Sequence, residues 1–162
     1  MNENNAKKII IGCDHAGYHA KLKLIEKLGR DGYTVTDVGC FSDESCDYPI
    51  PVHSLCQKIQ SGEFPLGILI CGTGIGVSIA ANKHRGIRAA VCSDPFSTEM
   101  TRKHNAANVL CMGARVLDDQ KIAELTGIFL ANEPLTEERH IRRLRMISEL
   151  EDGSYDSKNY EL

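Results

Sequence analysis

The chemically most capable segment of this sequence is a cysteine followed by a glycine-rich turn, namely Cys71, Gly72, Thr73, Gly74, Ile75 and Gly76. Glycines let the backbone approach a ligand closely, and the helix predicted to follow points its free N–H groups toward the turn. An anion fits such a place, either a phosphate or an oxyanion that forms during a reaction. The positive end of that helix also favours a thiolate at Cys71, which could act as a nucleophile or a general base. A ligand-free connection and a simply buried thiol are the alternatives at this point.

Two nucleotide-binding motifs do not fit this turn. A dinucleotide fingerprint needs a further glycine where Val77 stands, and it belongs after the first strand of a domain. The phosphate loop of nucleotide hydrolases needs a lysine and a serine or threonine after its last glycine, and these are absent. The turn is therefore interpreted as an anion site of another kind.

Further candidate residues lie at the ends of predicted elements. Asp14 and His15 follow the first predicted strand, where the aspartate can cap a helix and the histidine suits a hydrogen bond to an anionic ligand. His104 and Asn105 lie at the predicted end of a later helix, where a surface or capping role is the alternative. The other four histidines are interpreted as ordinary surface or core residues.

Arg139 and Arg143 are spaced so that they share one face of a predicted helix. Two guanidinium groups on one face could clamp a phosphate, because each offers a planar set of donors. The alternative is a solvated basic face, since Arg142 and Arg145 lie nearby.

The elements that must position these residues alternate between strand and helix. Short apolar or β-branched runs predict strands at residues 8–11, 34–38, 66–71, 88–91 and 109–112. Helical spacing follows Asp14 and recurs at residues 52–59, 77–83, 95–104, 118–131 and 137–150, with an irregular loop at 40–51. This order predicts a Rossmann-like, three-layer α/β/α sandwich around a five-stranded parallel sheet. Such sheets bind ligands at the carboxyl ends of their strands, near a switch point in strand order.

Length and composition limit the class of protein. The chain has 162 residues, of which 42% are hydrophobic and 25% charged, so we expect one domain, at residues 1–150, and a polar, frayed tail at 151–162. The formal net charge of −3 argues against a general nucleic-acid surface. No apolar run approaches the roughly 20 residues that span a bilayer, and the N-terminus lacks the apolar stretch of a secretory signal. We therefore predict a cytoplasmic protein without a nucleic-acid or membrane partner.

The seven cysteines are consistent with a cytoplasmic location, because their number is odd and a chain of this length needs no disulfide to stabilise it. No Cys-x-x-Cys pair occurs, and no cysteine or histidine spacing is typical of a zinc site. Apart from Cys71, each cysteine is expected to be a small buried hydrophobic residue.

Several short motifs together resemble those of one enzyme family, the type B ribose-5-phosphate isomerases and related sugar-phosphate isomerases. The resemblance extends from about residue 8 to residue 150, and no single motif is as specific as the ordered set. The motifs are Gly12-Cys13-Asp14-His15-Ala16-Gly17, Asp47-Tyr48-Pro49, Ile70-Cys71-Gly72-Thr73-Gly74-Ile75-Gly76, Ala80-Ala81-Asn82-Lys83, His104-Asn105-Ala106-Ala107-Asn108-Val109 and Gly113-Ala114-Arg115.

The resemblance implies an enzyme that interconverts ribose 5-phosphate and ribulose 5-phosphate without a metal or cofactor. It implies a homodimer, sometimes paired into a tetramer, with the active site between subunits. Cys71 would move a proton between C2 and C1, Thr73 and the N–H groups of the turn would stabilise the enediolate, and His104 of the neighbouring subunit would open the sugar ring. The implied substrate contacts are Asp14 and Tyr48 at the sugar hydroxyls, Asn105 at a further ligand group, and His15, Arg115, Arg139 and Arg143 chiefly at the phosphate.

One branch of this family replaces the cysteine with a glutamate base just after the last glycine of the turn. That position is Val77 here, so the chain follows the cysteine branch. Allose 6-phosphate and galactose 6-phosphate are alternative substrates for the same mechanism. A module that binds a sugar phosphate or a nucleotide without catalysis is the alternative of another class.

Overall fold

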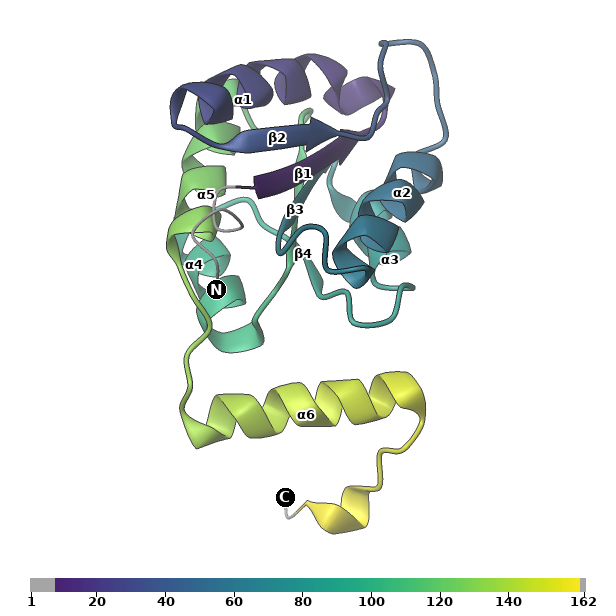
Figure 1. The fold of residues 1–162 in the computed structure, drawn as a ribbon, viewed down its shortest axis with the longest axis vertical. Coiled ribbons are helices and arrows are strands. Elements are labelled where there is room, and N and C mark those ends of the chain that lie inside the picture. The colour runs from purple at the N-terminus through teal and green to yellow at the C-terminus, as the bar shows by residue number, and fades with distance from the viewer. Residues whose placement is uncertain (1–7, 161–162) are drawn as a thin grey trace.

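A parallel sheet of five strands forms the centre of the computed structural model, which describes residues 8–160 (Figure 1). The strands are β1 (Lys8–Cys13), β2 (Thr34–Asp37), β3 (Gly67–Cys71), β4 (Ala89–Val91) and β5 (Val109–Gly113). Their order across the sheet is β2-β1-β3-β5-β4. The chain therefore moves to one side of β1 for β2 and to the other side for β3, which makes the β1–β3 boundary the switch point.

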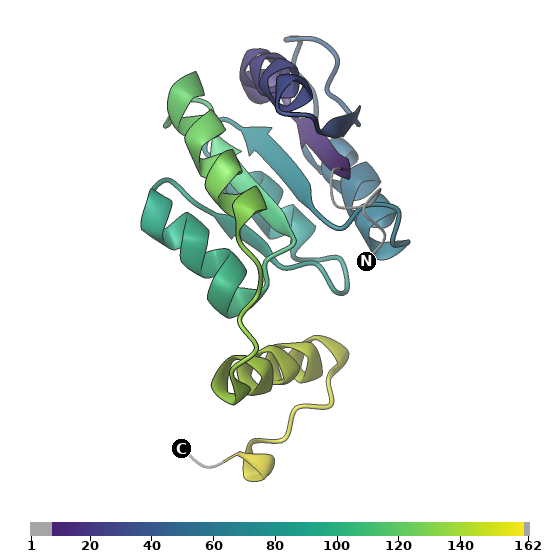
Figure 2. The same ribbon diagram turned by 60° about the vertical axis from the view of Figure 1, so that its left-hand side comes forward.

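Helices cover both faces of the sheet, as the alternating sequence pattern predicts. One face carries α1 (Tyr18–Arg30) and α5 (Asp119–Ala131), with α4 (Pro95–Asn105) beside α5. The other face carries α2 (Pro49–Gln60) and α3 (Ile75–Ala81). Figures 1 and 2 show the three layers, and a sixth helix, α6 (Glu138–Asp152), lies apart from them. The three-layer α/β/α sandwich is confirmed.

The bounds predicted from the sequence and those in the structure differ most at α2. The helix begins at Pro49, whereas the sequence predicted an irregular loop up to residue 51. The two prolines near the end of that loop suggested continued irregularity. Pro49 instead occupies the first helical position, and Pro51 lies within the first turn. Backbone N–H groups have no helical partner there, so proline is tolerated.

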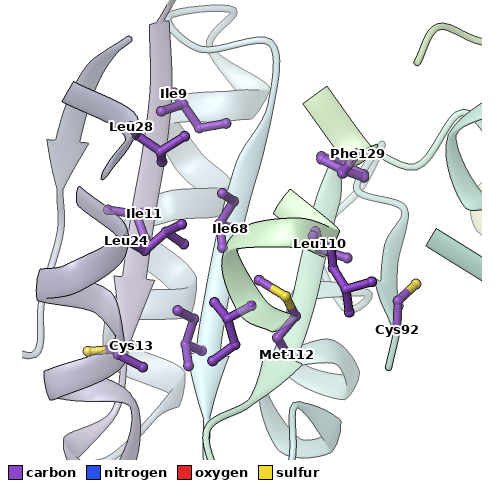
Figure 3. Close-up of a cluster of buried hydrophobic side chains, with 14 of the residues drawn as sticks. Ile9, Ile11, Cys13, Leu24, Leu28, Ile68, Cys92, Leu110, Met112 and Phe129 are labelled. Atoms are coloured by element: carbon purple, nitrogen blue, oxygen red, sulfur yellow. The ribbon is translucent and has the colours of Figure 1, made fainter. Parts of the chain in front are cut away.

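Apolar side chains from the two helix layers cover the two faces of the sheet. Figure 3 shows the larger cluster, in which Ile9 and Ile11 of β1 lie against Leu24 and Leu28 of α1. Phe129 of α5 packs in the same cluster and is fully buried. Each such side chain contributes roughly 1.5–3 kcal/mol on burial, which holds the strand ends in fixed positions.

Helix α6 is attached to the sandwich at its two ends. Near its start, the Leu135 N–H group donates to the Lys103 carbonyl oxygen at 2.8 Å. Near its end, the Glu151 carboxylate accepts from the Gly86 N–H group at 2.9 Å. Between these points lies a pocket of about 650 Å³, and Ile147 and Leu150 of α6 line it. Only one residue of α6 is buried, so most of an amphipathic helix faces outward.

The polar segment after residue 150 makes contacts within itself and back to α6, as far as residue 160. The Glu149 carbonyl oxygen accepts from the N–H groups of Ser154 and Tyr155. The Tyr160 hydroxyl donates to the Glu149 carboxylate at 2.7 Å, and the rings of Tyr155 and Tyr160 stack. One glutamate thus folds the segment back onto α6.

Residues 1–7, on which the expectation of a missing signal segment rests, lie outside the described residues, as do 161–162. Across residues 8–160, no helix has the length and apolar character needed to cross a lipid bilayer.

Candidate active site

The carboxyl ends of β1, β3 and β5 bring together the first group of predicted site residues. Cys71 ends β3, and the β5 end lies directly beside it, because Cys71 is in register with Gly113. On the other side, Cys13 at the end of β1 pairs with Ile70. The first group lies at these strand ends and in the segments that directly follow them, up to the first turn of α3. Its residues are Asp14, His15, Cys71, Gly72, Thr73, Gly74, Ile75, Gly76 and Arg115.

The Cys71 thiol lies inside the glycine turn with only 5% of the residue exposed. Its sulfur accepts a hydrogen bond from the Gly74 N–H group at 3.1 Å. A backbone N–H donor of the turn thus points at the sulfur. Gly74 has a φ of +80°, and a side chain there would also meet the Met112 backbone at 3.0 Å. Glycine is therefore required where the turn bends toward the sulfur.

Arg115 and Tyr48 lie against two other glycines of the turn. The Arg115 N–H group donates to the Gly72 carbonyl oxygen at 3.0 Å, and a Cβ on Gly72 would lie 3.4 Å from the Arg115 side chain. A Cβ on Gly76 would lie 3.0 Å from the Tyr48 ring. The Arg115 side chain and the Tyr48 ring thus both lie beside the turn.

Asp14 and His15 approach the same place from β1. The Asp14 carboxylate is buried and accepts from the N–H groups of Ala16 and Gly17 at 2.9 and 3.1 Å, so it caps the single turn that follows. The His15 Nδ1 atom accepts from the Cys46 N–H group at 3.4 Å. In a neutral ring this leaves the proton on Nε2, which is then a hydrogen-bond donor for an anion.

The second group of predicted residues lies around the end of α4 and the start of α6. His104 and Asn105 are in the last turn of α4, and Arg139 and Arg143 are exposed on α6. The ring of His104 stacks on that of His140, with centroids 4.5 Å apart. The sequence pattern did not single out His140, although its position between the two arginines could have suggested it.

His140 is the buried residue of α6, and its surroundings favour the neutral ring. Loss of hydration lowers its pKa, and the positive charge of Arg139 and the proximity of His104 act in the same direction. The Arg139 Nε–H group donates to the His140 Nε2 atom at 3.2 Å. A neutral His140 can thus stack on His104 without repulsion between like charges.

Within one chain, the two groups lie at opposite ends of the strands: the His104 group at the amino ends and the Cys71 group at the carboxyl ends. Strand β5 starts at Val109, close to Asn105, and reaches the level of Cys71 only at Gly113. Four residue steps along a strand correspond to about 13 Å. The described chain by itself therefore does not bring the His104 group to the Cys71 thiol.

The cysteines differ from the sequence expectation at two positions. Cys13, Cys56, Cys92 and Cys111 are buried thiols, as expected, and burial raises their pKa values. Cys40 and Cys46 form a disulfide and are only half-buried, so they are not core residues. Composition could not reveal this pair, because their proximity depends on the path of the loop after β2.

Among residues 8–160, no three His, Cys, Asp or Glu side chains are grouped to hold a metal ion.

A cysteine within a glycine turn at the switch point, with the Arg115 side chain beside it, is an arrangement that suits a small anionic ligand. The chain belongs to the Ribose/Galactose Isomerase family, whose model matches residues 9–147. Ribose-5-phosphate isomerase B of Escherichia coli is 41% identical over 145 residues, which are 90% of this chain and 97% of that protein. D-erythrulose-4-phosphate isomerase of Pectobacterium atrosepticum is 41% identical over 126 residues, or 77% of this chain and 83% of that protein.

A solved structure has the same fold. Ribose-5-phosphate isomerase B of Clostridium thermocellum superposes with a TM-score of 0.88 at 42% identity, covering 91% of this chain and 99% of that chain. The family resemblance inferred from the ordered motifs is confirmed.

Proposed function

We propose that this protein interconverts ribose 5-phosphate and ribulose 5-phosphate through an enediolate, with Cys71 as the general base. The observation that carries the proposal is the Cys71 sulfur, held by the Gly74 N–H group in a chain 41% identical to the E. coli isomerase. Residues 1–150 form the isomerase domain in this proposal, residues 151–162 form its tail, and no cofactor takes part. The cytoplasmic location stays a prediction from the sequence.

The chemistry requires one base that takes a proton from C2 of the aldose and returns it to C1. A thiolate at Cys71 is placed for this role, because the sulfur lies inside the glycine turn and already accepts one N–H hydrogen bond. As the proton leaves, negative charge grows on the substrate oxygens. Thr73 and the N–H groups of the turn supply fixed donors there, and one such donor is typically worth about 2.7–4 kcal/mol.

Substrate recognition divides between the sugar and the phosphate. Asp14 and Tyr48 contact the hydroxyl groups, and Asn105 makes a further contact. His15, whose Nε2 atom carries the proton in the neutral ring, joins Arg115 in holding the phosphate from the Cys71 side. Arg139 and Arg143 complete the phosphate site from α6 of a second copy of this chain. Binding energy from the phosphate positions the reacting carbons against Cys71.

The complete site is formed by two copies of this chain. Two observations support this. The His104 group and the Cys71 thiol lie at opposite ends of the strands within one chain. In addition, α6 exposes apolar side chains at Ile141, Ile147 and Leu150. Exposed apolar surface of this kind is typical of an interface. In a two-fold dimer, each Cys71 would meet the partner's His104, which opens the sugar ring. A pair of such dimers remains an expectation from the resemblance.

The proposed function is tested by assaying isomerisation with four substrates in the presence of a chelator. We expect ribose 5-phosphate to be the fastest, ahead of erythrulose 4-phosphate, allose 6-phosphate and galactose 6-phosphate. A faster tetrose or hexose phosphate would keep the mechanism and change the substrate. No turnover of any of the four by folded, reduced protein would favour the non-catalytic binding module.

Replacing Arg143 with alanine is expected to raise KM for ribose 5-phosphate about tenfold, the effect of losing one charge-assisted contact of roughly 1.4 kcal/mol. The turnover number should change much less, because the phosphate contact persists throughout the reaction. Steady-state kinetics at constant ionic strength measure both. Arg142→Ala is the matched control, since it removes the same charge from an adjacent position of α6 that points about 100° away. Equal KM values for the two variants would return Arg143 to a solvated basic face.

A further inference from the structure

The loop between β2 and α2 carries a cysteine pair that the isomerase mechanism does not use. Cys40 and Cys46 are joined by a disulfide across five exposed residues, 41–45. Both are half-buried, whereas the other five cysteines are buried within the sandwich. Reaction of thiols with oxidants follows exposure, so this pair is the accessible one.

One end of the loop is held firmly whatever the state of the sulfur atoms. The Lys21 ammonium group is fully buried and donates to the Cys40 carbonyl oxygen at 2.6 Å. The same group forms an ion pair with Asp37 at 2.7 Å. The Asp37 carboxylate in turn accepts from the Gly39 N–H group at 2.9 Å. Breaking the disulfide would leave these contacts in place.

The other end of the loop leads into the active site and is held weakly. The Cys46 N–H group makes the 3.4 Å hydrogen bond to His15 that orients this ring. Two residues later comes Tyr48, whose ring lies against Gly76 of the turn. A pocket of about 330 Å³ lies beneath the loop, lined by Cys40, Cys46 and Ile50 among others, so the segment is not packed on a solid core. The disulfide joins this weakly held end of the loop, at Cys46, to the end that Lys21 holds at Cys40.

We propose that Cys40 and Cys46 form a redox modification site whose co-reactant is a low-molecular-weight disulfide, and that its oxidised state holds His15 and Tyr48 in position for the sugar phosphate. The second part rests on the proposed isomerase function. The first part concerns the thiols alone.

The chemistry is a two-step thiol–disulfide exchange. The thiolate of one cysteine attacks a sulfur of the external disulfide, forms a mixed disulfide and releases one thiolate. The second cysteine, as its thiolate, attacks the protein sulfur of that mixed disulfide and releases the other external thiolate. Two protein thiols are oxidised, one external disulfide is reduced to two thiols, and the two protein protons pass to the released thiolates. An excess of external thiol reverses both steps.

The thiol state is measured first, by equilibrating the intact protein in glutathione buffers from fully reduced to mostly oxidised. Free thiols are then alkylated, and each cysteine-bearing peptide is identified by mass spectrometry. We expect Cys40 and Cys46 to lose alkylation together as the buffer becomes oxidising, while buried Cys56 stays unmodified unless the protein is unfolded first. Alkylation of both residues at the most oxidising ratio would overturn the proposal.

Kinetics of the same samples test the coupling to the active site. The oxidised protein should have a KM for ribose 5-phosphate about three- to tenfold below that of the reduced protein, because a pre-ordered loop costs less to fix on binding. The double variant Cys40→Ser with Cys46→Ser should keep the KM of the reduced protein at every glutathione ratio. Because it retains Cys71, any loss of activity that it shares with the native protein reports oxidation of Cys71.

Equal KM values for the oxidised and reduced native protein would overturn the coupling between the pair and the site. A protein that forms the disulfide but isomerises no substrate in either state would contradict the proposed function, and the modification site would stand. The reduced native protein also provides the comparison if the double variant does not fold, as judged by circular dichroism.

Discussion

Cys71→Ala is expected to lower turnover of ribose 5-phosphate at least about a hundredfold, because no other group at the turn can take up the C2 proton. Substrate affinity should stay within a few-fold of the native value, since the phosphate contacts do not involve the sulfur. The variant should also fold normally: the change removes one sulfur atom from a turn whose backbone is fixed by bonds such as Ala114 N–H to the Cys71 carbonyl oxygen at 2.8 Å. Turnover and equilibrium binding of the sugar phosphate measure the two quantities separately.

Cys56→Ala is the matched control for this experiment. Cys56 lies in the same apolar cluster as Cys71 and loses the same atom, but burial raises its pKa to about 12, so it holds no thiolate at neutral pH. Its variant should lose some stability and keep its activity. If Cys71→Ala kept more than a tenth of native turnover, the general-base assignment would be wrong.

Much of the fold could be predicted because the local signals agree with the tertiary structure. Strand β3 ends at Cys71, where the glycine-rich turn begins. The residues that follow β1 and β5 lie at the same end of the sheet, because the strands are parallel. The first half of the site is therefore a consequence of strand–helix alternation. Its residues needed no long-range information beyond the expectation that the strands pair in parallel.

The features that the sequence pattern missed depend on contacts between distant segments. His140 is one of several polar residues on α6, and only the packing of α6 against the end of α4 places it on His104. Glu149 similarly organises the tail through Tyr160, a contact that polar composition does not indicate. The disulfide of Cys40 depends on the path of an irregular loop, where no periodic pattern exists to be interpreted.

The separation of His104 from Cys71 leads to the second large effect, recovery of activity from two inactive variants. Cys71→Ala and His104→Ala should each be nearly inactive on ribose 5-phosphate as homodimers, because every site lacks one of the two groups. When the two chains are unfolded together and refolded, half of the dimers are mixed at equal amounts. Each mixed dimer holds one site with neither group and one site with both. The mixture should therefore reach about a quarter of native activity in a two-fold dimer.

The control for this recovery uses two variants from the same half of the site, Cys71→Ala and Thr73→Ala. Both residues belong to one glycine turn, so a mixed dimer still has one damaged residue at each turn, and refolding them together should restore no activity. Recovery in the first mixture with none in the second requires that Cys71 and His104 of one site come from different chains. Activity that stays near zero in both mixtures would mean that each chain completes its own site. The end of α4, which carries His104, would then have to move about 13 Å or more toward the carboxyl ends of the strands in its own sheet. The buried Arg102 side chain in the same turn of α4 donates to the Ala107 and Asn132 carbonyl oxygens and opposes such a movement, so the structure favours recovery.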